Sequence, residues 1–173
     1  MARIRHIALA VKDIDKTADF YEKAFGLKRS EKAEGKTAWR IYMSDGEINL
    51  ALLQYKSEVG SGVDPTTFVG IHHFGFQCDD LEAQQKRIEA AGGKFFFDLG
   101  DPDDDDFERK FRDPNGIIFD VNWKGWTMTS SKVKAKNKKM TAKAAAKTAK
   151  TAVKRSSRTA GTKAHKRAAS RAR

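Results

Sequence analysis

An internal repeat constrains the fold of this chain more than any other feature of its sequence. Residues 6–15 read HIALAVKDID, and residues 73–82 read HFGFQCDDLE. Each segment begins with a histidine, continues with the alternating apolar pattern of a strand, and has an Asp seven residues later where a helix should begin. We therefore expect two copies of one supersecondary unit.

Each copy predicts a strand, a helix and three further strands. The predicted helices span about residues 14–25 and 81–91, and each is followed by glycine, which favours termination. The further strands are expected near residues 27–32, 37–43 and 48–55 in the first copy and near residues 94–99, 107–112 and 117–123 in the second. The predicted fold class is α+β, with two βαβββ modules.

Charge divides the chain into two regions of opposite sign. The whole chain has a formal net charge of +11, but residues 131–173 contain 16 Lys and Arg and no Asp or Glu, which leaves 18 basic and 23 acidic residues in residues 1–130. The basic segment has no aromatic residue, so it cannot bury enough apolar surface to offset its ordering entropy. We predict one domain over residues 1–126 and a disordered Lys/Ala-rich basic tail over residues 127–173.

Cysteine content and hydropathy argue against a secreted or membrane-spanning protein. The single cysteine, Cys78, cannot form an intramolecular disulfide and is expected to be a buried core thiol in a reducing compartment. The apolar run near the N-terminus is too short for a secretory signal, and no stretch approaches the ~20 apolar residues of a membrane span. We expect a cytoplasmic protein without membrane association. Its basic tail would allow it to associate with the nucleoid.

Two histidines and one carboxylate are candidate metal ligands. His6 and His73 occupy equivalent positions of the repeat, so its symmetry should bring them close together. Asp120 lies mid-strand among apolar neighbours, where an unpaired carboxylate is costly, and it therefore needs a partner. Two histidines and a carboxylate on separate strands can hold a divalent metal and leave positions open for a substrate. The alternative, that each histidine is a hydrogen-bonded structural residue, stays open at this point.

The sequence resembles the vicinal oxygen chelate superfamily, which includes glyoxalase I, methylmalonyl-CoA epimerase, fosfomycin-resistance thiol transferases and extradiol dioxygenases. The resemblance covers about residues 3–123 and rests on the segments HIALAVKD, FYEKAFGL, GIHHFGFQCDD and DPNGIIFDV. It implies paired modules that form a curved, cup-like mixed sheet around a divalent metal, with His6, His73 and Asp120 as the ligands. Fe, Mn, Ni and Zn are the candidate metals, and the resemblance also implies a homodimer.

The repeat decides which of two adjacent histidines matches the family pattern. His73 is the match, because its spacing to Asp80 equals the spacing of His6 to Asp13. Strict alternation then places His72 on the opposite face of the strand, where it would be structural or lie at the rim.

Two departures from the family pattern bear on the reaction. Glyoxalases and epimerases usually have Glu or Gln where this chain has Asn49, and an amide is a poor general base for abstracting a proton from carbon. The last ligand is usually Glu, so the shorter Asp120 would need its strand to come closer.

The resemblance implies a metal-dependent enzyme of the lyase, isomerase or transferase type, in which the metal is a Lewis acid for a small-molecule substrate chelated through neighbouring oxygens. One alternative is an extradiol-type Fe(II) dioxygenase, for which Tyr42 and Tyr55, besides Asn49, are candidate catalytic residues. Another is a non-catalytic small-molecule binding module. The tail resembles the Lys- and Ala-rich arms of linker-histone-like proteins, and residues 131–173 would bind nucleic acid or polyphosphate without sequence readout.

Overall fold

The computed structural model describes residues 1–59 and 61–130 of the chain, and apart from one additional short strand, β3, it confirms the predicted order of elements. The strands are β1 (Arg3–Ala10), β2 (Lys28–Arg29), β3 (Ala33–Glu34), β4 (Ala38–Ser44), β5 (Asn49–Tyr55), β6 (Gly70–Gln77), β7 (Lys94–Leu99), β8 (Glu108–Arg112) and β9 (Ile118–Asn122). The helices are α1 (Ile14–Phe25) and α2 (Leu81–Ala90), and neither is long and apolar enough to cross a membrane. The predicted disordered tail lies, from residue 131 on, outside the described residues.

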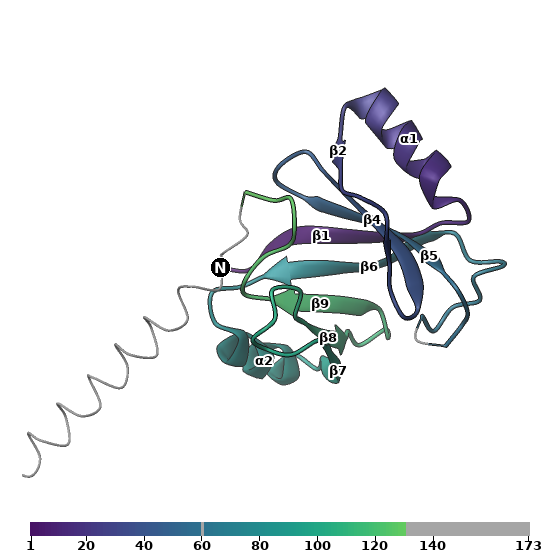
Figure 1. Cartoon of the computed structure of the whole chain (residues 1–173). Helices are drawn as coiled ribbons and strands as arrows, with labels where there is room; N and C mark the ends of the chain where they lie inside the picture. The colour runs from purple at the N-terminus through teal and green to yellow at the C-terminus, as the bar shows by residue number, and fades with distance from the viewer. Residues whose placement is uncertain (60, 131–173) are drawn as a thin grey trace, which may run out of the picture. The chain divides into compact units, whose positions relative to one another are not determined.

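The strands form one mixed sheet in which each module supplies one half (Figure 1). The strand order is β2-β4-β5-β1-β6-β9-β8-β7, with β3 paired to β4. The two modules meet where β1 runs antiparallel to β6, and each of these strands is parallel to the last strand of its own module, β5 and β9. In this order β2 and β7 are the end strands and do not pair with each other, so the sheet is open.

The two helices begin where the repeat predicts. The Asp13 side chain accepts a hydrogen bond from the backbone N–H of Lys16, and Asp80 accepts one from Ala83. Both contacts are helix N-caps, which satisfy backbone donors that have no partner within the helix. Helix α1 ends at Gly26, whose φ of 69° lies in the left-handed region that glycine adopts without strain.

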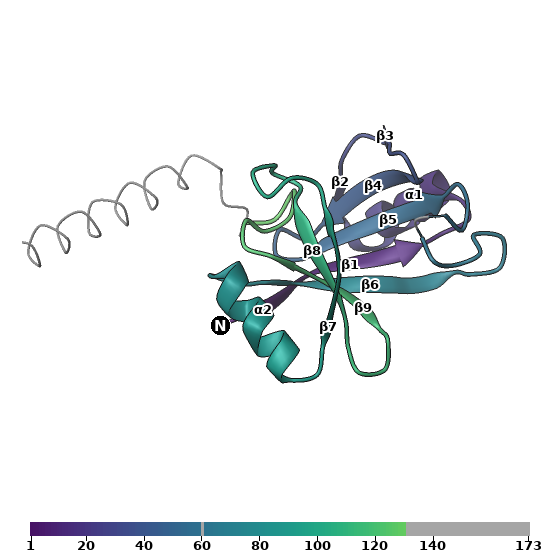
Figure 2. The ribbon, with the colours of Figure 1, turned by 90° about the horizontal axis from the view of Figure 1, so that it is seen from below.

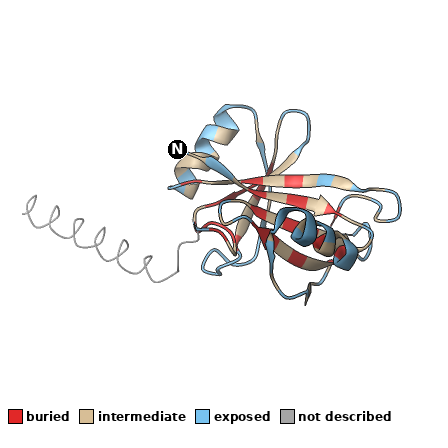
Figure 3. Ribbon diagram, turned by 90° about the horizontal axis from the view of Figure 1, so that it is seen from above, coloured by how far each residue is buried: buried red, intermediate tan, exposed pale blue. Residues whose placement is uncertain are grey.

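Each helix covers its own half of the sheet. Figure 2 shows α1 beside β4 and β5, and α2 near β7. Figure 3 shows buried positions along the strands of the sheet, and the buried apolar residues include one packed cluster in each module. The first comprises Ile14, Ala18, Ile41, Met43 and Leu52, and the second comprises Cys78, Phe111 and Val121. The prediction that Cys78 is a buried core thiol is confirmed.

Two β-bulges interrupt the pairing of β1 with β6. The register skips Arg5 on β1 and His72 on β6, so each module has one extra residue directly before the histidine that opens its repeat, His6 or His73. A bulge changes the direction of the side chains beside it. The prediction that His72 points away from His73 is therefore wrong, because it assumed uninterrupted alternation, and the two rings are in contact, with their Nδ1 atoms 2.7 Å apart.

Candidate metal centre

The three predicted ligands lie on the adjacent strands β1, β6 and β9. In the sheet register, Gly75 pairs with His6 on one side and with Asp120 on the other. One ligand atom each from His6, His73 and Asp120 lies within 4.8 Å of the other two. The Nε2 atom of His73 is 3.3 Å from His6 Nε2 and 3.3 Å from Asp120 Oδ2. The fold therefore brings together all three residues that the sequence analysis named.

These side chains are buried, which limits the charges they can carry. His6, His73 and Asp120 are 2%, 6% and 0% exposed. Burial lowers the pKa of His6, and it lowers the pKa of His73 well below the ordinary value with a further contribution from the Lys110 ammonium. Both imidazoles are therefore neutral at pH 7, the form that binds a metal.

The proton of His6 is placed by its neighbour on β5. The Asn49 amide nitrogen donates to the carbonyl oxygen of Thr127 at 2.9 Å, so its oxygen faces His6 Nδ1 at 2.8 Å. Because an amide oxygen only accepts, Nδ1 of His6 must donate. In a neutral ring this leaves a bare lone pair on Nε2, the atom that faces His73 and the Asp120 carboxylate.

The Asp120 carboxylate has one oxygen paired and one without a donor. Lys110 Nζ donates to Asp120 Oδ1 at 2.7 Å, so the expectation that this carboxylate needs a partner is met. Among the described residues, Asp120 Oδ2 receives no hydrogen bond although it is buried, which is costly for a polar oxygen. A cation between this oxygen and the two histidine nitrogens would satisfy all three atoms, so the residues fit a divalent metal.

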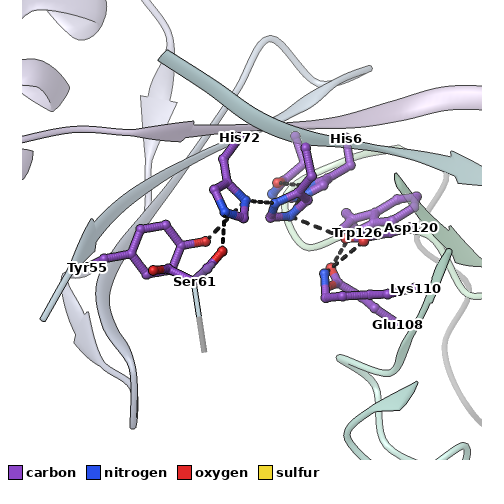
Figure 4. Close-up of polar contacts among 10 residues, drawn as sticks. His6, Tyr55, Ser61, His72, Glu108, Lys110, Asp120 and Trp126 are labelled. Carbon is purple, nitrogen blue, oxygen red and sulfur yellow. Dashed lines mark hydrogen bonds and ion pairs between the residues drawn. The ribbon is translucent and has the colours of Figure 1, made fainter. Parts of the chain in front are cut away.

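Lys110 is shared between two carboxylates (Figure 4). Its Nζ is 3.2 Å from Glu108 Oε2 as well as 2.7 Å from Asp120 Oδ1. Burial is the largest single effect on Glu108 and acts to raise its pKa, but the Lys110 ammonium, His6, His73 and the Trp126 hydrogen bond together outweigh it, so the net shift is downward. Burial and then the charge of Glu108 raise the pKa of Asp120 well above its ordinary value, against the effect of Lys110. Two carboxylates with one ammonium thus leave this region short of positive charge.

The segment after β9, residues 124–130, folds back across the site to the first module. Trp126 stacks on His6 with a ring separation of 5.0 Å and an interplanar angle of 9°, and its indole N–H donates to Glu108 at 2.6 Å. The backbone N–H of Ser130 donates to the carbonyl of Gly46 at 2.7 Å. Residue 75 must be small, because a Cβ there would lie 2.6 Å from the Trp126 ring.

A cavity of about 240 Å³ lies beside these residues. Trp126 and Glu108 form part of its wall. Both residues also belong to the hydrogen-bonded group around Lys110, because Trp126 donates to Glu108 and Glu108 pairs with Lys110. Arg40 and Tyr42 from β4 line the same cavity, and so do three consecutive acidic residues, 104–106. The charged residues of the lining are therefore mainly acidic, and Trp126, which stacks on His6, forms part of the wall.

The three candidate catalytic residues occupy different places. Asn49 is fully buried and holds His6, so its amide supports a ligand. Tyr42 lines the cavity, whereas the Tyr55 hydroxyl lies 3.4 Å from His72 Nδ1. Burial raises the pKa of each tyrosine to about 12, so both are protonated at neutral pH.

Four residues of the site were missed by the sequence analysis: His72, Glu108, Lys110 and Trp126. Lys110 could have been found from the sequence. The turn at residues 113–116 sets the register of the β8–β9 hairpin, and this register places Lys110 directly opposite Asp120. His72 was noticed but placed on the wrong face. Glu108 and Trp126 come together only through the fold-back of residues 124–130.

The fold and the site define an α+β protein in which two βαβββ modules share an open sheet and present a group that could hold a metal. The sequence profile of the Glyoxalase/Bleomycin resistance protein/Dioxygenase superfamily matches residues 3–121. The chain belongs to this superfamily, which the sequence resemblance had predicted.

Individual relatives are distant. The anthracycline biosynthesis protein DnrV of Streptomyces peucetius is 28% identical over 128 residues, which cover 70% of this chain and 46% of that protein, so the chain spans less than half of DnrV. An ethylmalonyl-CoA/methylmalonyl-CoA epimerase of Cereibacter sphaeroides is 26% identical over 99 residues, 54% of this chain and 74% of the epimerase. The solved methylmalonyl-CoA epimerase of Streptomyces coelicolor superposes with a TM-score of 0.55 at 21% identity, covering 69% of this chain and 94% of that one. This structural likeness supports the fold.

Proposed function

We propose that the chain is a metal-dependent enzyme acting on a small molecule, with His6, His73 and Asp120 as the ligands of a divalent cation. The observation that carries this proposal is the convergence of three buried acceptor atoms, one of which, Asp120 Oδ2, accepts no hydrogen bond among the described residues. When bound, the cation would supply Lewis-acid chemistry to neighbouring oxygens of a substrate.

The chain's own residues hold the centre and restrict the entry of water. Asn49 fixes the proton of His6 on Nδ1, and Lys110 holds Asp120 through the oxygen that does not face the histidines. Trp126 covers His6 and is itself only 5% exposed. Electrostatic interactions are stronger in such a site because bulk water is excluded.

Among the residues around Lys110, Glu108 is the group we propose to move a proton. It is a carboxylate in the cavity wall, and its lowered pKa keeps it ionised at neutral pH. The two tyrosines stay protonated and would only donate hydrogen bonds. Ionised Glu108 can accept a proton, which the Asn49 amide cannot, but its lowered pKa makes it a weak base that would act only on a strongly acidified substrate proton.

The cavity lining bears on the class of substrate. Acidic residues 104–106 and Glu108 outnumber Arg40 there, so a polyphosphate group would be repelled. Some relatives are named for CoA thioesters, which carry such a group. We therefore propose a small substrate without a phosphorylated carrier.

The first test is the metal content of the purified full-length protein. We expect about one equivalent of a divalent metal after reconstitution, lost in each of the variants His6→Ala, His73→Ala and Asp120→Ala. The exposed Asp79→Ala variant is the matched control and should keep its metal. If the wild type holds less than about a tenth of an equivalent, the proposal fails and the non-catalytic binding module takes its place.

The ligand set also supports the dioxygenase alternative, since two histidines and one carboxylate are the ligands of many non-haem Fe(II) oxygenases. Anaerobic loading with Fe(II), followed by oxygen-uptake measurements with catechols, separates the two reactions. Catechol-dependent oxygen uptake supports the dioxygenase, and its absence in an iron-loaded sample supports Lewis-acid chemistry. The homodimer stays a prediction, which sedimentation velocity can measure.

We also propose that residues 131–173 bind nucleic acid through charge alone. Sixteen basic residues without an acidic one would displace counterions from a phosphate backbone, which gives binding without sequence readout. The full chain should bind duplex DNA at low salt and lose affinity steeply between 50 and 200 mM salt, about 10³-fold or more if six or more phosphates are contacted. Equal binding by a chain that ends at Ser130 would show that the tail is not responsible.

A further inference from the structure

His72 is the extra residue of the bulge in β6, and both nitrogens of its ring take part in hydrogen bonds (Figure 4). Its Nε2 lies 2.8 Å from the carbonyl oxygen of Ser61, and its Nδ1 lies 2.7 Å from Nδ1 of His73. A carbonyl oxygen only accepts, so Nε2 of His72 carries a proton. A neutral imidazole has one N–H, and Nδ1 of His72 is then an acceptor.

The same reasoning fixes the proton of His73. Two bare nitrogens 2.7 Å apart would repel each other, so the short contact requires a proton, and His73 Nδ1 must be its donor. Nε2 of His73 is then left with a free lone pair. That atom faces His6 Nε2 and Asp120 Oδ2, each at 3.3 Å.

We propose that His72 is a positioning residue that holds His73 as the Nδ1–H tautomer, with Nε2 available to bind the metal. The role of this tautomer in metal binding rests on the proposed function, whereas the tautomer itself follows from the hydrogen bonds. Burial lowers the pKa of His72 and of His73, which agrees with two neutral rings.

The alternative tautomer has two local acceptors that His72 must outcompete. If His73 carried its proton on Nε2, it could donate to Asp120 Oδ2, which has no other described donor, or to the bare Nε2 of His6, each 3.3 Å away. That state would leave no lone pair for a cation. The contact with His72 is shorter, 2.7 Å against 3.3 Å, and therefore favours the metal-binding form.

The role belongs to His72 and is not a general property of the repeat. The equivalent bulge residue of the first module is Arg5, whose guanidinium pairs with Glu47 at 2.5 Å. In that module Asn49, on the neighbouring strand, places the proton of His6. The two modules therefore reach the same tautomer by different contacts. Such hydrogen-bond partners of metal-binding histidines typically contribute 10- to 100-fold in metal affinity.

The test uses the full chain and two readouts, one of which needs no metal. Long-range ¹H–¹⁵N NMR of the metal-free protein at pH 7.5 should show His73 protonated at Nδ1 and bare at Nε2. His72→Phe keeps a ring but has no acceptor, so a mixed or Nε2–H tautomer and a Zn²⁺ Kd raised about 10- to 100-fold are expected. His72→Gln can accept from His73 and donate to Ser61, and should keep both properties, within about threefold for the Kd.

Tyr55→Phe is the matched control, because it removes the hydroxyl at 3.4 Å from the same His72 nitrogen and should change neither readout. An Nε2–H tautomer of His73 in the wild type overturns the proposal even if the His72→Phe variant does not fold. An unchanged tautomer and Kd in folded His72→Phe also overturn it. If the wild type has the predicted tautomer but binds no divalent metal, the proposed function fails while the positioning role of His72 stands.

Discussion

Among residues 1–59 and 61–130, Lys110 is the one ammonium that contacts both Glu108 and Asp120, so replacing it tests the charge arrangement at the site most directly. Lys110→Met keeps most of the side-chain volume but removes hydrogen bonds of 2.7 Å and 3.2 Å to these two buried carboxylates. Removing one partner of a buried ion pair typically costs about 3–5 kcal/mol, because the remaining charge is uncompensated. We expect the free energy of unfolding at pH 7 to fall by about this amount.

The loss should depend on pH in a definite direction. Without the ammonium, the pKa of Glu108 loses a main cause of its lowering and rises, and the pKa of Asp120 rises further above its unfolded value. A raised carboxyl pKa destabilises the folded state as pH increases, so the difference from wild type should be largest near pH 7 and smaller near pH 5. Urea denaturation at both pH values measures it. Lys86→Met, at an exposed position on α2, is the control and should change stability by less than about 0.5 kcal/mol. A loss below about 1 kcal/mol for Lys110→Met at pH 7 would refute the reasoning.

Two further predictions concern packing and pH. Gly75→Ala would place a Cβ 2.6 Å from the Trp126 ring and 3.1 Å from His6 Cβ. We therefore expect the free energy of unfolding, measured by urea denaturation, to fall by about 1–3 kcal/mol, and the Zn²⁺ affinity, measured by calorimetry, to weaken. Unchanged values for both would mean that Trp126 does not need this space. The buried histidines predict acid sensitivity, because their folded-state pKa values lie below the ordinary value of 6.5. Below pH 6.5 the unfolded chain takes up protons that folded His6 and His73 do not, so the free energy of unfolding of the metal-free protein should fall by up to about 1.4 kcal/mol per pH unit for each histidine. The double variant His6→Gln/His73→Gln should show a flatter dependence, and an equal slope in both proteins would contradict this assignment.

Local sequence signals predicted the framework of the fold. The repeat, the N-cap residues Asp13 and Asp80, and the turn at residues 113–116 act within a few residues, so they can be read without knowing the rest of the molecule. Helix boundaries agreed to within about two residues. The short strand β3 was not predicted, because two residues that pair with β4 carry no periodicity of their own.

The candidate ligands could also be named from the sequence. Two positions of the repeat, His6 and His73, become neighbours when the modules are related by the pairing of β1 with β6. Asp120 was identified because a carboxylate in an apolar strand requires a partner. These arguments depend on residue type and strand alternation alone.

The sequence by itself thus determined the two modules and the residues that could bind a metal, whereas the tertiary structure decided how those residues are held. Strand alternation placed His72 on the wrong face, because a bulge arises from cross-strand pairing and leaves no mark in the order of residues. The contact of Trp126 with His6 likewise depends on the fold-back of residues 124–130. Protonation of the histidines is set by such contacts between distant segments, and only the folded chain brings them within hydrogen-bonding distance.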